Sequence, residues 1–329
     1  MPCDLNLAEH QRQILDAAET MLTAKYPMSR LRGGAPDDLA AIAGFGAFAM
    51  GAPEPGGYAA FGLVDEVLLH VRLGRHLVST RALAAAIAGR LVVELGRNDL
   101  AEQTASGGVA VCAAMPAADS LLLVDAADAH AAVLFQERGL ALVDLSTTSG
   151  EPATGLGRSV PLTRLRGSHV TTVGASAGAG LRRTADLLVC AQLLGVAEAT
   201  RDLAVSYAKV RHQFGRPIGA FQAIKHHCAS MAVASEMLSA QLDMAAIAAQ
   251  DGRDDAPFQV AALTLLAPRI AFANARTCIQ IHGGIGFSAE ADAHHYLKQA
   301  HVLRLLLSRT DLLELPAPLA PLRALDEGI

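Results

Sequence analysis

The chain of 329 residues is long enough to form two or three domains and to bury a large core. Its formal net charge of -5 and pI near 6.2 lack the basic excess that nucleic-acid binding requires, so we expect no nucleic-acid partner. The 52% of hydrophobic residues are mainly Ala, Leu and Val rather than aromatics, which suits an all-helical core or a large buried subunit interface.

The sequence predicts no membrane span and no secreted, disulfide-linked protein. The longest nearly uncharged stretch, Leu39 to Leu63, contains Pro53, Pro55 and a Gly-Gly pair, which prevent one continuous helix. The N-terminus lacks a basic segment followed by an apolar one, and the five cysteines are odd in number, scattered and form no Cys-x-x-Cys pair. We therefore expect a cytoplasmic protein with no membrane partner.

Residues 1–105 are expected to form an N-terminal helical domain. Asn6-Leu-Ala-Glu9 is typical of a capping box, and apolar residues from Ile14 to Leu22 then recur at helical spacing. Clusters of Gly and Pro at 33–36 and 53–57 interrupt the chain, and helices are predicted from Asp38 and over 63–73. The segment 92–105 closes this helical region.

Residues 106–175 are expected to form a reduced β domain. After Ser106-Gly-Gly, short apolar runs occur at 109–112, 131–135 and 139–145, and a polar Gln-Glu-Arg turn separates the last two. The region ends near a Gly- and Ala-rich linker at 174–180, and the whole chain contains no tryptophan.

Residues 176–329 are expected to form a C-terminal four-helix bundle. Helical periodicity returns after Leu181, and one predicted helix face carries Met231, Leu238 and Leu242. The breaks fall at 215–219, 251–257 and 283–286, which divide the segment into four helices. The chain order is therefore helical, β, helical.

Two turns between these helices carry the residues with possible binding chemistry. In the first, Arg211 can grip a phosphate with two hydrogen bonds while Phe214 packs on a planar ring. In the second, Gly283-Gly284 lets a backbone approach an anion, next to the amide of Gln280. On residue types alone we favour the structural interpretation of each turn, in which the arginine complements a helix dipole and the glycines form an ordinary turn.

Together, at this separation, the two turns resemble the flavin-binding segments of acyl-CoA dehydrogenases. The resemblance extends to Glu66–Arg75 and to the loop Gly51–Gly57, so it covers nearly the full chain, and Glu290–Ala300 is similar to members that act on steroid or other bulky CoA thioesters. It implies a mainly α fold with a small β domain. It also implies FAD, with the second turn reaching the cofactor from a neighbouring subunit. The matching cofactor residues are Arg211, Gln213, Phe214, Ile218, Gln222, Gln280, Gly283 and Gly284.

The resemblance departs from the family at the catalytic base. Acyl-CoA dehydrogenation requires a carboxylate that takes the α-proton while flavin accepts the β-hydride. The usual glutamate position aligns with Leu307, and the less common position aligns with Ala185. Asp186 is adjacent to the latter, although neighbouring helical residues point about 100° apart. The β region also differs from that of active members of the family. They carry a Thr-Glu-Pro-x-x-Gly-Ser-Asp segment where this chain has residues 113–120.

A reduced β domain without a base resembles the smaller subunit of α2β2 acyl-CoA dehydrogenases of bacterial steroid degradation. We therefore expect an acyl-CoA substrate, a homo-oligomer or a heterotetramer with a catalytic acyl-CoA dehydrogenase subunit, and electron-transfer flavoprotein as electron acceptor. Two alternatives stay open. One is a non-catalytic scaffold that has lost flavin, and the other is a homomeric dehydrogenase with an unrecognised base, such as a water held by Asp186 or Glu290.

The histidines and serines predict no further site. Adjacent pairs such as His226-His227 and His294-His295 point to different helix faces and lack a carboxylate at zinc-site spacing, so we expect no metal. Ser206 and Ser308 do not lie in a Gly-x-Ser-x-Gly segment of the kind that carries a nucleophilic serine.

Overall fold

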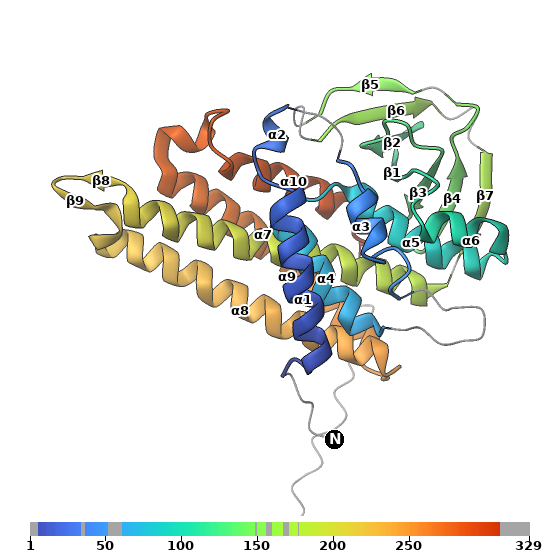
Figure 1. Ribbon diagram of the computed structural model, residues 1–329, viewed down its shortest axis with the longest axis horizontal. Coiled ribbons are helices and arrows are strands. Elements are labelled where there is room, and N and C mark those ends of the chain that lie inside the picture. Colours follow the sequence, from blue (N-terminus) through green and yellow to red (C-terminus); the bar gives the residue numbers. More distant parts are fainter. Residues whose placement is uncertain are drawn as a thin grey trace, which may run out of the picture.

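The computed structural model describes residues 6–33, 37–51, 61–148, 150–155, 160–166, 171–176 and 178–309. The chain passes from helices to a sheet and back to helices, and the sheet lies at one end of the molecule (Figure 1). This mainly helical architecture with one small sheet confirms the fold class that the sequence predicted. The expected loop at 51–57 lies, apart from Gly51, outside the described residues.

The helices that precede the sheet pack around α4 and α5. They are α1 (Glu9–Lys25), α2 (Arg30–Gly33), α3 (Ala40–Gly44), α4 (Leu63–Arg75), α5 (Thr80–Glu94) and α6 (Asn98–Ala105). Ala8 occupies the N-cap of α1, and its backbone N–H donates to Gln11 Oε1 at 2.9 Å. The predicted capping box at Asn6 was therefore placed two residues too early.

The sequence pattern did not predict helix α5. Its alanine-rich residues are buried on nearly every side, so the sequence shows no contrast between an apolar and a polar face. Ser79 caps its start by accepting a hydrogen bond from Arg81 N at 3.1 Å. The single segment expected over 92–105 is in fact the end of α5, a break at 95–97, and α6.

The sheet has the order β5-β6-β2-β1-β3-β4-β7, with β1 and β3 parallel and the other pairs antiparallel. The three predicted apolar runs overlap β1, β3 and β4, which are neighbours in the sheet. The sequence did not predict β2, β5, β6 and β7; β6 (Leu162-Thr-Arg-Leu-Arg166) is polar enough to hide its strand signal, whereas β2 (Ser120-Leu-Leu-Leu-Val124) is an apolar run that was overlooked. The strands are β1 (Val111–Ala117), β2 (Ser120–Val124), β3 (Ala131–Phe135), β4 (Leu140–Asp144), β5 (Glu151–Ala153), β6 (Leu162–Arg166) and β7 (Thr171–Ser176).

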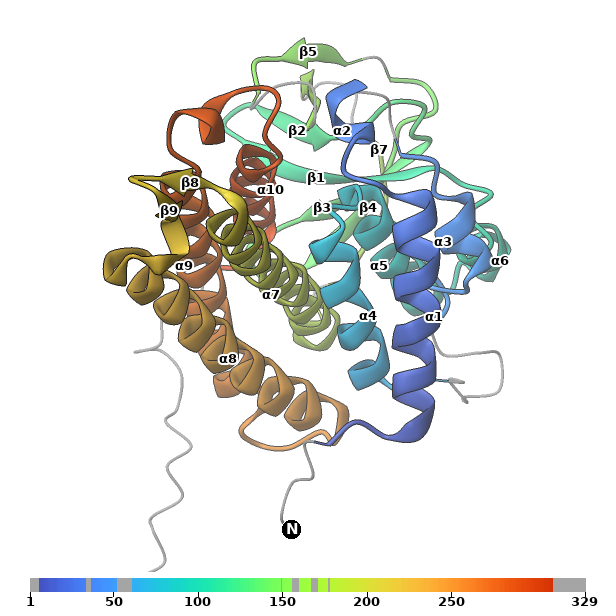
Figure 2. The ribbon, with the colours of Figure 1, turned by 60° about the vertical axis from the view of Figure 1, so that its left-hand side comes forward.

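The C-terminal helices form a bundle around α7, which lies between α4 and the pair α8 and α9 (Figure 2). A β8–β9 hairpin joins α7 to α8, and the short η3 helix joins α9 to α10. The elements are α7 (Ala179–Val210), β8 (His212–Gln213), β9 (Arg216–Pro217), η2 (Ile218–Ala220), α8 (Gln222–Gln250), α9 (Ala256–His282), η3 (Gly283–Phe287) and α10 (Ala293–Leu306).

Two glycines allow α4 and α7 to approach closely. A Cβ added to Gly74 would lie 2.2 Å from the carbonyl oxygen of Gln192, and one added to Gly195 would lie 2.2 Å from that of Val71. Any larger residue at either position would push the two helices apart. This contact ties the N-terminal helices to the bundle and explains the glycine of the Leu-Gly-Arg segment that ends α4.

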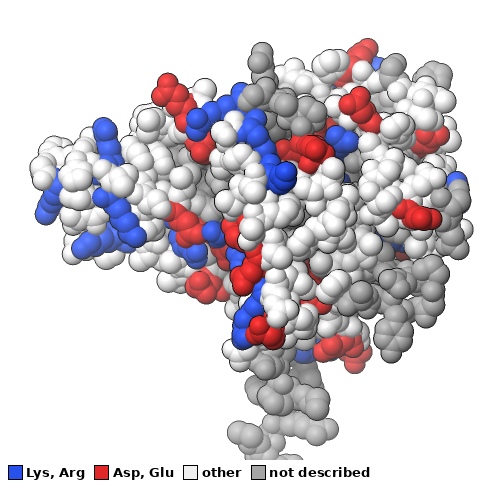
Figure 3. Space-filling view, in the orientation of Figure 1, with Lys and Arg blue, Asp and Glu red and all other residues white. Residues whose placement is uncertain are grey.

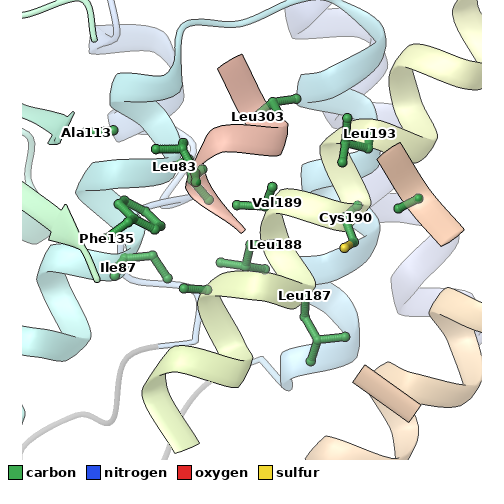
Figure 4. Close-up of a cluster of buried hydrophobic side chains, with 14 of the residues drawn as sticks. Leu83, Ile87, Ala113, Phe135, Leu187, Leu188, Val189, Cys190, Leu193 and Leu303 are labelled. Carbon is green, nitrogen blue, oxygen red and sulfur yellow. The ribbon is translucent and has the colours of Figure 1, made fainter. Parts of the chain in front are cut away.

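The main core lies where α5, the sheet, α7 and α10 meet (Figure 4). Leu83 and Ile87 of α5, Phe135 of β3, Leu188 of α7 and Leu303 of α10 are all at most 4% exposed and belong to one cluster. The segment Ala256–Phe287 is long and apolar enough to pass a test for a membrane span, but half of its apolar window is buried inside the protein. Its α9 portion packs against α7, α8 and α10, as a core helix does.

Candidate functional site

The first candidate turn is a strained hairpin at the far end of the bundle. After α7, the strands β8 and β9 are joined by Phe214 and Gly215, whose φ angles of 51° and 78° are both positive. Such a turn favours glycine, so a phenylalanine in it is strained. The Phe214 side chain is nevertheless 87% exposed, and a large exposed aromatic at a strained position indicates a binding role.

The glycines of the second candidate turn differ in the structural reason for having no side chain. Gly283 follows α9 with φ of 64°, and Gly286 packs so closely that a Cβ would lie 2.7 Å from the carbonyl oxygen of Ile279. A Cβ at Gly284 would meet no atom within 4 Å, and its φ is not in the left-handed region. Nothing within the described part of the chain therefore demands a glycine at 284, whereas a ligand backed against the turn would.

The two turns line one cavity of about 570 Å³, which we call the bundle-end cavity. All the predicted cofactor residues except Gln222 line it; Gln222 is the exposed first residue of α8. The resemblance divided the turns between two subunits, but here a single chain presents both to the same space. The lining residues are Tyr207, Arg211, Gln213, Phe214, Ile218, Phe221, Ile224, Gln280, Ile281, His282, Gly283, Gly284 and Ile285.

The bundle-end cavity is suited to an anion. None of its lining residues is acidic, and the sequence has no Asp or Glu over 203–235 or over 256–289. The end of the molecule that carries β8 and β9 shows lysine and arginine but no carboxylate (Figure 3). Arg211 is exposed, and no ion pair engages it within the described ranges. Its guanidinium is therefore available to a phosphate.

Three aromatic residues that line the bundle-end cavity, Tyr207, Phe221 and His282, were not among the residues predicted from the sequence. Tyr207 and His282 stack with ring centroids 4.2 Å apart and planes at 19°. The guanidinium of Arg216 lies 4.3 Å from the centre of the Phe221 ring. The only signal in the sequence was that Tyr207 and His282 fall inside the two motifs, since nothing in their spacing indicates that α7 and α9 end side by side.

The positions expected for a catalytic base lie at the opposite end of α7. Ala185 is fully buried in the main core. Leu307 lines a second cavity of about 1010 Å³ between the sheet and helices α9 and α10, which we call the sheet cavity. Its polar lining includes Arg269, Arg304 and Ser308, and none of its lining residues is acidic.

Asp186 is engaged in a buried ion pair. It is 3% exposed, and its carboxylate lies 3.0 Å from the guanidinium of Arg182. It also accepts hydrogen bonds from Ser308 N at 3.0 Å and Ser308 Oγ at 2.7 Å. Burial raises the pKa of Asp186, with Arg182 and Ser308 opposing the shift. These contacts tie α7 to the end of α10. Glu290 is exposed and lines neither cavity.

A third space, the lateral cleft, lies between α1 and α4 on one side and α7 and α8 on the other, with a volume of about 1000 Å³. Asp243 of α8 lines it. Burial of this carboxyl, reinforced by the nearby charge of Glu198, raises its pKa to about 6.

The comparisons with known proteins agree with this arrangement. Residues 184–307, which span the bundle, match the family described as "Acyl-CoA dehydrogenase, C-terminal domain". Acyl-CoA dehydrogenase IpdE2 of Mycolicibacterium smegmatis is 31% identical over 257 residues, which are 78% of this chain and 78% of that protein. The chain belongs to the acyl-CoA dehydrogenase family, whose members are oxidoreductases.

Other similarities fit the same family. Acyl-CoA dehydrogenase FadE34 of Mycobacterium tuberculosis is 34% identical over 278 residues, which are 80% of this chain but only 39% of that protein. The fold matches the structure described as "Tcur3481-Tcur3483 steroid ACAD G363A variant" with a TM-score of 0.77 and 22% identity, covering 91% and 94% of the two chains. It matches the ChsE4-ChsE5 complex from Mycobacterium tuberculosis with a TM-score of 0.74 and 20% identity, covering 92% and 94%.

Proposed function

We propose that this chain is the FAD-binding subunit, without a catalytic glutamate, of a heteromeric enzyme that introduces an α,β double bond into an acyl-CoA thioester. One contrast carries the proposal. The cofactor residues predicted from the sequence, apart from Gln222, line one open cavity, whereas both base positions carry apolar residues, Ala185 and Leu307.

The residues of the bundle-end cavity fit the adenosine diphosphate part of FAD. Arg211 would pair with the pyrophosphate, and the backbone at Gly283 and Gly284 would approach the cofactor where no Cβ intervenes. Phe214 would pack on a planar ring of the cofactor, and the amide of Gln280 would contact its polar groups. When bound, FAD accepts the β-hydride of the substrate.

A partner subunit would supply the carboxylate that removes the α-proton. The residues lining the sheet cavity include no Asp or Glu, and Asp186 is committed to Arg182 and Ser308. The bundle-end and sheet cavities are also far apart, since Tyr207 and Asp186 are 21 residues apart on α7, which corresponds to about 31 Å. The similarity of fold to a ChsE4-ChsE5 complex supports a heteromeric assembly.

The remaining assignments follow from the family. We propose a steroid or similarly bulky acyl-CoA as substrate, electron-transfer flavoprotein as acceptor, and a cytoplasmic location. We also propose the division into a helical domain (1–105), a reduced β domain (106–175) and a bundle (176–329) that binds FAD and mediates oligomerisation.

The proposal is tested by purifying the chain alone and after co-expression with an acyl-CoA dehydrogenase subunit encoded beside it. Visible absorption, native mass and acyl-CoA oxidation are then recorded. We expect acyl-CoA oxidation in the mixed oligomer only, and flavin that copurifies with that oligomer. We expect Arg211→Met in this chain to lower the flavin content of that oligomer at least tenfold, because a charge-assisted bond contributes about 1.5–3 kcal/mol. Lys225→Met, at an exposed cation outside the cavity lining, is the matched control.

Other results would overturn the proposal. A colourless protein in both samples would mean a scaffold that has lost flavin. A yellow and active homo-oligomer would mean a homomeric dehydrogenase, and Asp186→Asn and Glu290→Gln would then identify which of the two carboxylates acts in it.

A further inference from the structure

The inner wall of the bundle-end cavity is an aromatic pair that the FAD proposal leaves without a role. Tyr207 comes from the last turn of α7, and His282 is the last residue of α9. Their rings stack at 4.2 Å, and His282 is only 9% exposed. Stacking on Tyr207 restricts the rotation of the imidazole, so that its ring edge has a defined direction.

One hydrogen bond fixes the tautomer of His282. Its Nδ1 lies 2.8 Å from the backbone carbonyl oxygen of Cys278. A carbonyl only accepts, so Nδ1 must carry the hydrogen, and in the neutral ring Nε2 then carries a lone pair. Within the described ranges no donor is bonded to Nε2, and His282 lines the cavity. The wall of the cavity therefore offers a hydrogen-bond acceptor at a fixed position.

We propose that His282 Nε2 accepts a hydrogen bond from the exocyclic amino group of an adenine base, so that the cavity selects adenine nucleotides over hypoxanthine nucleotides. The inference rests on the proposed binding of the adenosine diphosphate part of FAD. Adenine presents an N–H donor at its 6-position, whereas hypoxanthine presents a carbonyl oxygen there. An oxygen facing Nε2 would leave two acceptors opposed and unpaired, which a site built to receive a donor strongly disfavours. His282 is thus a specificity-determining residue, and Tyr207 is the residue that positions it.

The experiment compares ADP with inosine diphosphate by isothermal titration calorimetry on the full chain. The two ligands carry the same phosphates and sugar, so their difference isolates the 6-position. We expect ADP to bind at least tenfold more tightly than inosine diphosphate. His282→Phe keeps an aromatic ring against Tyr207 but removes the acceptor, and should bring the ratio of the two dissociation constants to within twofold of one. His282→Gln retains an acceptor oxygen and should keep part of the preference.

Arg211→Met separates this inference from the proposal on which it rests. It should weaken both ligands at least tenfold and leave their ratio unchanged, because the phosphates are common to both. Equal binding of the two ligands by the wild type, with dependence on Arg211, would overturn the role of His282 alone. Binding that does not depend on Arg211, or no binding of either ligand, would overturn the proposed FAD site as well. Melting temperatures of all variants identify any loss of folding.

Discussion

At the start of α7, Arg182 and Asp186 are buried and pair with each other, whereas just beyond its end Arg211 is exposed and no carboxylate lies among its cavity neighbours. Burying a charge is costly unless it is paired and hydrogen-bonded. At the first end the charge of Asp186 is paired with Arg182 and bonded to Ser308, while Arg182 Nε and Nη1 are buried without a hydrogen-bond partner among the described residues. The second end keeps a cation, Arg211, that has no ion-pair partner in the described part of the chain, together with an exposed phenylalanine and open space beside Gly284. A titratable residue near an expected active site can therefore be assigned a catalytic role only when its ion-pair and hydrogen-bond partners are known.

The largest effect is expected where the charges are paired. Arg182→Met would leave Asp186 buried without its counter-ion and remove the bond from Arg182 to the carbonyl oxygen of Leu306. We expect the free energy of unfolding to fall by about 3–5 kcal/mol in urea denaturation. Arg183→Met, one residue along and partly exposed, is the matched control and should cost less than about 0.5 kcal/mol. Similar losses in the two variants would show that the pair is not buried in solution.

For Arg211 we expect the opposite result, which is a small change in stability and a large loss of FAD affinity. Arg211→Met should change the free energy of unfolding by less than about 0.5 kcal/mol, because the side chain is exposed and holds no partner in the described chain. The same variant should lose at least tenfold in affinity for FAD, measured by flavin fluorescence titration. If stability fell and FAD affinity did not, Arg211 would be structural, and the contrast between the two ends of α7 would fail.

The expected effect of Asp243 in the lateral cleft is intermediate, since this carboxylate is partly buried and no ion pair engages it among the residues that the structure describes. Its pKa is raised from 3.8 to about 6, so between these pH values the native state holds a proton that the unfolded state has lost. Stability contributed by this proton is present below pH 4 and disappears as the pH rises through 6. Asp243→Asn should therefore stabilise the protein by about 1 kcal/mol at pH 7.5, allowing for solvent screening, and by nothing at pH 4.

Urea denaturation across this pH range measures the Asp243 effect. Asp251→Asn, on the exposed rim of the same cleft, is the control and should show no such trend. An advantage of Asp243→Asn that grew on acidification would contradict the assigned direction of the shift.

The smallest effect on stability is expected at Gly284. Gly284→Ala should leave the free energy of unfolding within about 0.5 kcal/mol of the wild type, because the added methyl group meets no atom of the described protein. The methyl group would instead enter the bundle-end cavity and weaken FAD binding several-fold. Gly286→Ala is the contrasting variant, since its methyl group would collide with the Ile279 carbonyl and destabilise the fold. Thermal melting and FAD titration of both variants distinguish the two glycines.

The sequence predicted the order of helical and β regions and most of the cavity residues, because these depend on local periodicity and on two short motifs. It could not predict α5, whose all-round burial removes the periodic signal. It could not show that Asp186 is bonded to Ser308, 122 residues away, or that Tyr207 stacks on His282, since such contacts depend on tertiary packing. Conversely, Gln222 was predicted from its motif to contact the cofactor, but in the fold it does not line the bundle-end cavity.

Hydrogen exchange of the purified chain, with and without added FAD, tests the difference between the two ends of α7 most directly. We expect slower exchange at the backbone amides of Gly283–Phe287 and of the hairpin from His212 to Pro217, where the cofactor would contact the chain. We expect no change at Ser308, whose amide donates to Asp186, or at the start of α7, because neither lines the bundle-end cavity. Slower exchange at Ser308 and the start of α7 but not at the two turns, or no change anywhere, would contradict the proposed cofactor site.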